Sequence, residues 1–197
     1  INIADKLGKV LTVFQNRRWD GDFLTIKYLV KKNAVGRIVE FESRFDRFRN
    51  YLKDDAWKEK DLPGSGILYD LSPHLIDQAL QLFGAPKWLY ADVRNQRGGE
   101  TDDRFEIRLF YDGFIATLGA GMLVADKTPR FVLRGVEGSF TKFGFDPQEE
   151  LLARGSDPNR PNWGIEPQEQ HDRTNPYRYR HISCVLSQCS GYNKRQG

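Results

Sequence analysis

The feature that most constrains the fold is a stretch of alternating apolar and polar residues between positions 88 and 143. Within residues 103–111, apolar side chains recur at every second position, which is typical of a strand with one buried face. Asp112-Gly113 follows directly, and Glu137-Gly138 separates two further β-rich runs. Both dipeptides favour tight hairpins, so we expect antiparallel pairing of the strands they join. The expected strands of this stretch are residues 88–96, 103–111, 114–122, 130–134 and 139–143.

Residues 37–49 have the same period of two, with Phe41 and Phe45 facing one way and charged side chains facing the other. Residues 22–32 and 67–83 instead place their apolar side chains at helical spacing. Two helices and about six mainly antiparallel strands predict an α+β fold. We expect an open, mainly antiparallel β-sheet with helices on one face.

The N-terminal segment has a different pattern. Residues 10–14 form a short apolar, β-branched run that follows a polar helical stub at residues 4–9. Such a run predicts a fully buried strand of the kind found in parallel sheets. The chain also lacks an initiator methionine, so we expect it to be part of a longer protein.

Charge and composition exclude several classes of protein. The net charge of +3 is too small to indicate binding to nucleic acid or to an acidic membrane. No segment approaches the roughly 18 apolar residues of a membrane span, and the first residues do not form a secretory signal. The only cysteines are Cys184 and Cys189, so the body needs no disulfides and a cytoplasmic setting is expected. Residues 169–197 have no clear periodicity, and we expect them to be poorly ordered.

The segment with the clearest chemical pattern is residues 64–77. Asp70, His74 and Asp77 are spaced four and three residues apart, so on a helix they share one face. They form a polar stripe on an otherwise apolar element. A carboxylate one turn from an imidazole can orient it and raise its basicity, which suits a general base near neutral pH.

Simpler interpretations of this segment stay open. Asp70 or Ser72 would serve as a helix cap if Pro73 lay in the first turn. His74 would then be an ordinary hydrogen-bonded core histidine. A metal site is disfavoured, because no second histidine or cysteine in the body completes a ligand set, and we expect none.

Two arginine-rich segments are further candidates. Asn16, Arg17 and Arg18 follow the predicted buried strand, and polar residues at such an edge bind ligands in open α/β sheets. An interdomain cluster of ion pairs explains them equally well. In residues 44–49, charges alternate with phenylalanine, which favours a solvated sheet face over a binding role for Arg47.

Several known motifs are absent from the sequence. It has no Gly-x-Gly-x-x-Gly between a strand and a helix, no phosphate-binding loop, no serine nucleophile elbow and no His-Glu-x-x-His. Gly119-Ala-Gly121 lies within a strand pattern and opens no helix, so it is not a dinucleotide-binding turn.

Four blocks of the sequence resemble one enzyme family in order and in register. They are LTVFQNRRWDGDFLTIKYL, GRIVEFESRFDRFR, GSGILYDLSPHLIDQALQLFG and FVLRGVEGSFTKFGFDPQEE. Together they resemble the C-terminal part of the Gfo/Idh/MocA oxidoreductases, and most closely the subgroup that includes NADP-dependent scyllo-inositol dehydrogenases. The resemblance extends from about residue 7 to residue 168.

This resemblance implies a fold and a set of site residues. The family combines an N-terminal Rossmann domain with a C-terminal α+β domain whose open sheet commonly packs against another subunit, so a homo-oligomer is expected. Its catalytic set is a lysine in a Glu-Lys-Pro motif together with an Asp-x3-His pair, and the pair matches Asp70 and His74. Asn16 and Arg17 match the stretch beside nicotinamide and substrate, which makes Arg17 a candidate for cofactor binding as well.

The resemblance also implies a division of the chain. Residues 1–19 correspond to the end of the Rossmann domain, residues 20–168 to the C-terminal domain, and residues 169–197 to a divergent tail. The Rossmann glycines and the Glu-Lys-Pro motif are absent from this sequence. NAD or NADP would therefore be bound mainly by a domain outside it, and we expect this chain alone to be inactive.

Two functions from different classes follow. The first is a part of an NAD(P)-dependent dehydrogenase that oxidises or reduces a secondary alcohol of a cyclic polyol or sugar. His74 is then the general acid or base, Asp70 orients it, and Asn16, Arg17 and Arg47 contact the substrate. The alternative is a non-catalytic oligomerisation or binding domain without turnover of its own.

Overall fold

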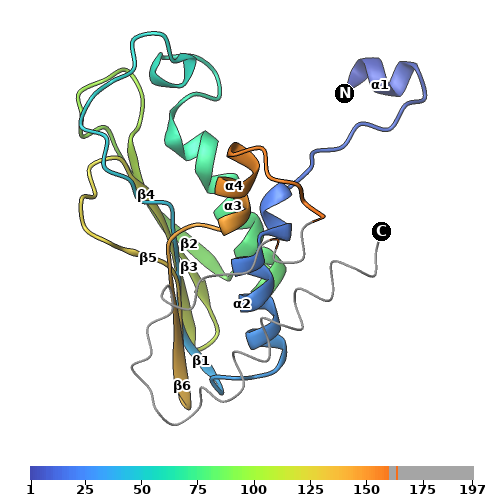
Figure 1. Ribbon diagram of the computed structural model, residues 1–197, viewed down its shortest axis with the longest axis vertical. Helices are drawn as coiled ribbons and strands as arrows, with labels where there is room; N and C mark the ends of the chain where they lie inside the picture. Colours follow the sequence, from blue (N-terminus) through green and yellow to red (C-terminus); the bar gives the residue numbers. More distant parts are fainter. Residues whose placement is uncertain (160–162, 164–197) are drawn as a thin grey trace.

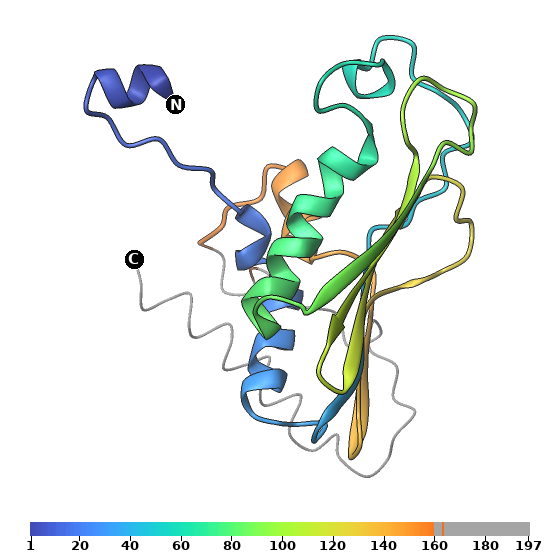
Figure 2. The same ribbon diagram turned by 180° about the vertical axis from the view of Figure 1, so that it is seen from behind.

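The computed structural model describes residues 1–159 and residue 163. In this part of the chain, a six-stranded sheet has its helices on one face, and the opposite face of the sheet is open (Figure 1, Figure 2). This confirms the predicted α+β architecture. The strands are β1 (Ile38–Arg44), β2 (Trp88–Arg94), β3 (Arg104–Tyr111), β4 (Phe114–Gly121), β5 (Pro129–Gly135) and β6 (Gly138–Phe143).

The strand order is β2-β3-β4-β1-β5-β6. Hairpins join β3 to β4 and β5 to β6, as the Asp-Gly and Glu-Gly turns predict. One neighbouring pair, β1 with β4, is parallel. Between these two strands the chain runs through a helix and the β2–β3 ribbon, and a long crossover of this kind is what a parallel pair requires.

The helical layer consists of α2 (Gly21–Lys31) and α3 (Gly66–Phe83), close to the predicted bounds. Further short elements are α1 (Asn2–Lys6), η1 (Asn16–Trp19), η2 (Trp57–Glu59) and α4 (Pro147–Ala153). The apolar faces of α2 and α3 pack on the sheet and form one core. Its fully buried members include Phe23, Ile26, Phe41, Leu75, Phe105, Leu118, Phe131 and Leu133.

The prediction of a buried strand at residues 10–14 is wrong for this structure. These residues have no strand conformation, and the side chains of Val10 and Val13 are 95% and 81% exposed. A strand of a parallel sheet needs hydrogen-bonded neighbours, and every strand in the described part of the chain pairs within residues 38–143. The segment and α1 instead extend away from the body (Figure 2).

The expectation of poor order for residues 169–197 lies outside the described residues. None of the helices in the described part has the length and hydropathy needed to cross a membrane.

Candidate functional site

The start of α3 determines the position of its polar stripe. Gly66 has φ +81°, and a Cβ there would lie 2.0 Å from Oδ1 of Asp102. The Asp102 carboxylate accepts a hydrogen bond from the Leu68 backbone N–H at 2.7 Å. Only glycine combines this conformation with this close contact, so the helix begins at Gly66.

Asp70 and Ser72 therefore lie inside α3, beyond its first turn, and the helix-cap interpretation of these residues is wrong. Pro73 also lies in the helix interior, where its ring removes one intrahelical hydrogen bond. Asp70, His74 and Asp77 are each partly buried, while Leu71 and Leu75 face the core. The predicted polar stripe is thus present at the edge of the helix–sheet core.

Each carboxylate of the stripe is paired with a cation from another segment. Asp70 pairs with Nζ of Lys58, which belongs to η2. Asp77 accepts two hydrogen bonds from Arg18, from Nε at 2.8 Å and from one terminal nitrogen at 2.5 Å. Neither carboxylate hydrogen-bonds His74 within the described residues.

His74 has no hydrogen-bond partner for its buried Nδ1 in the described structure. This does not fit the interpretation of a hydrogen-bonded core histidine. Burial lowers the pKa of His74 below 6.5, and the nearby charge of Arg17 lowers it further, against the opposite effects of Asp70 and Asp77. The expectation that Asp70 raises the basicity of the imidazole is therefore outweighed. A neutral imidazole at pH 7 can still accept a proton.

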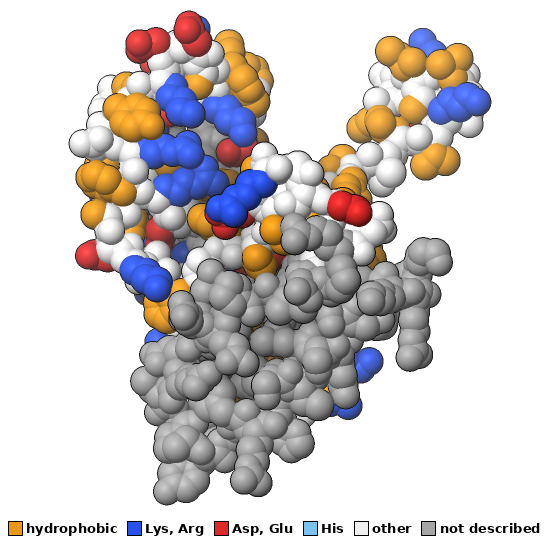
Figure 3. Space-filling model, in the orientation of Figure 1, with side chains coloured by type: hydrophobic (Ala, Val, Ile, Leu, Met, Phe, Trp, Pro, Cys, Tyr) orange, Lys and Arg blue, Asp and Glu red, His pale blue; other side chains and the backbone are white. Residues whose placement is uncertain are grey.

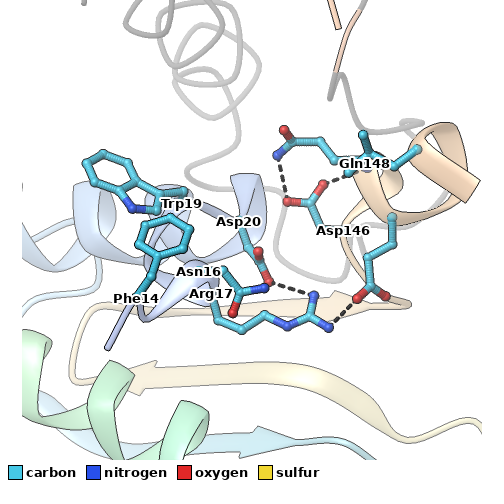
Figure 4. A pocket seen from close by; sticks show the side chains of 9 residues that line it. Phe14, Asn16, Arg17, Trp19, Asp20, Asp146 and Gln148 are labelled. Carbon is cyan, nitrogen blue, oxygen red and sulfur yellow. Dashed lines mark hydrogen bonds and ion pairs between the residues drawn. The ribbon is translucent and has the colours of Figure 1, made fainter. Parts of the chain in front are cut away.

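Arg17 lies in η1, and both its side chain and its backbone contact other segments. Its guanidinium pairs with Asp20 at 3.2 Å and with Glu149 of α4 (Figure 4). Its backbone carbonyl accepts a hydrogen bond from Nε2 of Gln78 in α3 at 2.8 Å. These contacts join η1, α3 and α4, which agrees with the predicted cluster of ion pairs at this position.

Asn16 and Arg17 line a pocket of about 620 Å³. The exposed aromatic side chains of Phe14 and Trp19 line one side of it, and Gln148 lies on the opposite side (Figure 4). The pocket thus combines aromatic side chains with hydrogen-bonding groups.

Arg47 and Asp70 line a second pocket of about 230 Å³. Burial and the neighbouring Arg49 lower the pKa of Arg47, whereas Asp70 raises it. The sequence-predicted site residues therefore divide between two pockets, with Asn16 and Arg17 in one and Arg47 and Asp70 in the other. His74 is electrostatically coupled to both Arg17 and Asp70.

Sequence reasoning missed a buried polar network beneath these pockets. Arg130 is only 3% exposed and donates to Oγ of Ser43 at 2.5 Å and to Oε1 of Gln78 at 3.0 Å. Its Nε lies 3.7 Å from Oδ2 of Asp22, and burial lowers its pKa to about 10. A bulge in β5 at this residue accounts for its position among the core side chains. The available signal was a charged residue in an otherwise apolar strand pattern.

Three carboxylates, those of Asp20, Asp22 and Asp146, come within 4.8 Å of one another. Burial and the charge of Asp22 raise the pKa of Asp20 to about 7. Asp146 already accepts hydrogen bonds from the backbone of Gly21 and from Gln148. Arg17 and Arg130 supply positive charge that offsets part of the negative charge of this cluster.

Residues 23–141 match the family model of the GFO/IDH/MocA C-terminal domain. The chain belongs to the GFO/IDH/MocA family. It is 45% identical over 165 residues to the uncharacterized oxidoreductase YdgJ of Escherichia coli, covering 83% of this chain and 47% of YdgJ. It is 41% identical over 164 residues to scyllo-inositol 2-dehydrogenase (NADP(+)) IolW of Bacillus subtilis, covering 83% of this chain and 46% of IolW.

The solved structure of yvaA from Bacillus subtilis superposes with a TM-score of 0.78 at 40% identity, over 86% of this chain and 48% of that one. The GFO/IDH/MocA chain described here thus spans about half the length of the curated relatives it matches. The relatives are named as oxidoreductases, so the chain is part of an enzyme family.

Members of the GFO/IDH/MocA family generally use NAD(P). Phe14, Trp19 and Asn16 offer a flat surface and a hydrogen-bonding amide, which fit a nicotinamide ring. Among the described residues that line this pocket, Arg17 is the only cation, and it is already paired with Asp20 and Glu149, so little positive charge is left for the phosphates of the cofactor. The residues present therefore fit the nicotinamide end of such a cofactor and not its pyrophosphate.

Proposed function

We propose that this chain supplies the substrate-facing part of an NAD(P)-dependent oxidoreductase that interconverts a secondary alcohol and a ketone on a cyclic polyol or sugar. The observation that carries the proposal is the state of His74. Its imidazole is half-buried, has a lowered pKa and lacks a hydrogen-bond partner in the described structure, while Asp70 lies one turn away. A group of this kind is ready to take a proton at neutral pH.

In this proposal His74 accepts the proton of the reacting hydroxyl and returns it in the reverse direction. A nicotinamide cofactor, when bound, would supply the acceptor for the hydride on the carbon that bears this hydroxyl, and loss of the hydroxyl proton and the hydride together would leave a ketone. Asp70, held by Lys58, contacts a neighbouring hydroxyl and keeps negative charge near the imidazole as it becomes protonated. Arg47 contacts the substrate from the same pocket as Asp70.

We further propose that Asn16 and Arg17 lie at the junction with the nicotinamide, and that a domain outside this chain binds most of the cofactor. Arg17 would exchange one of its carboxylate partners for the ligand, since both sides of its guanidinium are occupied here. The proposed domain bounds stay 1–19 and 20–168. Residues 1–14 extend away from the body (Figure 2), whereas η1, at the end of the first range, contacts α3 and α4.

The open face of the sheet is the proposed contact with a second copy of the chain. The rings of Trp88 and Phe110 stack on this face with their centroids 3.4 Å apart, and the side chain of Trp88 is 58% exposed. Ile115, paired with Phe110 in the sheet, adds apolar surface beside them. Exposed aromatic groups of this kind are enriched at interfaces.

The test is turnover by the full-length protein with NAD⁺ or NADP⁺ and scyllo-inositol, myo-inositol or D-glucose. His74→Ala should lower kcat by roughly 10²–10⁴-fold, the usual contribution of a positioned acid or base. Asp70→Asn should also slow turnover, because it keeps the shape of the side chain and removes its charge. The KM for substrate should change less than kcat, since the imidazole acts mainly while the proton moves.

Two variants serve as controls. Gln81→Ala alters an exposed position on the same helix, and Asp92→Asn removes the charge of a partly exposed, ion-paired carboxylate on β2. Both should retain the turnover of the unaltered protein. A fully active His74→Ala protein would instead favour the alternative, a domain that binds or oligomerises without taking part in catalysis.

A further inference from the structure

Basic side chains gather around the pocket that contains Asp70. Figure 3 shows them at the upper end of the molecule, over the loops between β1 and α3. Five cations line this pocket of about 230 Å³ against three carboxylates. The cations are Arg47, Arg49, Lys53, Lys58 and Arg97.

Only two of these cations have partners among the described residues. Lys58 pairs with Asp70, and Arg97, which is almost fully buried, pairs with Glu59 and with Asp103 outside the pocket. Arg47, Arg49 and Lys53 make no side-chain hydrogen bond or ion pair in the part of the chain that the structure describes. The pocket therefore contains three cations without an ion-pair partner in the described part of the chain, and its five cations against three carboxylates leave a net charge of +2.

The two arginines are held on a fixed backbone. The backbone N–H of Arg47 donates to the carbonyl of Gly121 at 2.9 Å, and that of Arg49 donates to Met122 at 2.7 Å. Phe48, between them, forms a bridge with Leu123. The backbone that carries the guanidinium groups is thus held at the end of β4, so ligand binding would have to order only the side chains of these arginines.

Because Arg47 is partly buried, a hydrogen-bond acceptor bound in the pocket would be favourable. Guanidinium has five N–H donors, and donors removed from water without a partner cost free energy. Burial and the charge of Arg49 both lower the pKa of Arg47, which indicates that positive charge at this point is under-compensated. An anion would satisfy the donors and relieve the repulsion between the two arginines. A cation would add to the repulsion.

We propose that this pocket binds the carboxylate or phosphate group of an anionic sugar or polyol, with Arg47, Arg49 and Lys53 as its contacts. The inference rests on the proposed function and narrows its substrate class. Arginine pairs such an oxygen-rich group through two parallel hydrogen bonds. The volume is smaller than the roughly 300–1,000 Å³ of pockets that enclose drug-sized ligands, so it suits one end of a small substrate. Asp70 lines the same pocket one turn from His74, which directs the rest of the substrate toward the imidazole.

The experiment measures binding of D-glucose, D-glucuronate and D-glucose 6-phosphate to the full-length protein by calorimetry at constant ionic strength. These three sugars share the same ring: D-glucose carries no anionic group, D-glucuronate carries a carboxylate and D-glucose 6-phosphate carries a phosphate. At least one anionic sugar should bind about tenfold or more tightly than glucose, as expected for charge-assisted hydrogen bonds. The stronger of the two identifies the anion.

Arg47→Gln/Arg49→Gln should remove this preference. Lys27→Gln/Lys31→Gln is the matched control, because it removes two charges from the exposed side of α2, far in sequence from the pocket, and should leave the preference intact. Lys53→Gln changes only an exposed side chain and should weaken anion binding several-fold, which guards against misfolding of the arginine variant. Equal affinity for the three sugars, no binding of either anion, or an unchanged preference in Arg47→Gln/Arg49→Gln would overturn the inference.

Turnover separates this inference from the function on which it rests. If neutral polyols are oxidised with full dependence on His74 and the anionic preference is absent, the anion site is wrong and the proposed function stands. If the preference is present but His74→Ala is fully active, the anion site stands and the catalytic role of His74 is wrong.

Discussion

Replacement of Arg130 by methionine should destabilise the protein by about 3–5 kcal/mol, the usual cost of removing one partner of a buried ion pair. Arg130 and Asp22 are 3% and 2% exposed, so water cannot solvate the Asp22 carboxylate after its arginine partner is removed. Ser43 and Gln78 lose their donor at the same time. Burial already raises the pKa of Asp22, and uptake of a proton by this carboxylate should keep the loss near the lower end of the range. At about 2–4 °C per kcal/mol, the melting temperature should fall by roughly 6–20 °C.

Urea and thermal unfolding followed by circular dichroism at pH 7 would measure this loss. Arg134→Met is the matched control, since its exposed guanidinium pairs with Glu40 and Glu42 and should contribute at most about 1 kcal/mol. Adding Asp22→Asn to Arg130→Met should recover part of the stability, because the unpaired buried charge is gone. The reasoning fails if Arg130→Met is no more destabilising than the control, or if Asp22→Asn gives no recovery.

Three further predictions concern the site, the acidic cluster and the open sheet face. The kcat/KM of the full-length enzyme should fall at acid pH with an apparent pKa below 6.5, because His74 must be neutral to accept a proton. A pH profile measured from about pH 5 to pH 8 would contradict this if the apparent pKa of the acid limb were above 6.5. The raised pKa of Asp20, about 7, means that the folded state holds an extra proton, so stability should fall as pH rises from about 4 to about 7. The full shift corresponds to roughly 4 kcal/mol, reduced by solvent screening, and urea midpoints for Asp20→Asn should show a flatter pH dependence than the unaltered protein. Trp88→Lys should weaken self-association about 30-fold or more if the tryptophan is central to the contact, and sedimentation equilibrium would refute the proposed interface by showing no change.

Much of the fold follows from local patterns. The period of two in residues 103–111 and the turn at Asp112-Gly113 are sufficient to predict β3, β4 and their hairpin, since both signals act over a few residues. The parallel pairing of β1 with β4 has no local signal, because it depends on a crossover of many residues. Helix α4 was missed although Asp146-Pro147 is a recognisable start, with the Asp146 carboxylate accepting from the Gln148 N–H at 2.8 Å.

The strand predicted at residues 10–14 shows the limit of such patterns. Apolar, β-branched residues indicate that a segment can form a strand when a neighbouring strand is present. Whether such a neighbour exists depends on the whole fold. Val10 and Val13 remain exposed because residues 10–14 pair with none of the described strands.

The candidate site depends on a similar distinction. Spacing alone places Asp70, His74 and Asp77 on one face of a helix, and the structure has them there. Spacing does not predict which charged side chains pair with these carboxylates, because Lys58 and Arg18 come from segments 12 and 59 residues away. Both carboxylates are paired with these cations, the pKa of His74 is lowered, and its Nδ1 has no hydrogen-bond partner among the described residues. A histidine bonded to Asp70 would be more basic and already occupied. In the proposed reaction, the long-range ion pairs would therefore keep the imidazole available for a hydroxyl proton, and Lys58 would act together with Asp70 and His74.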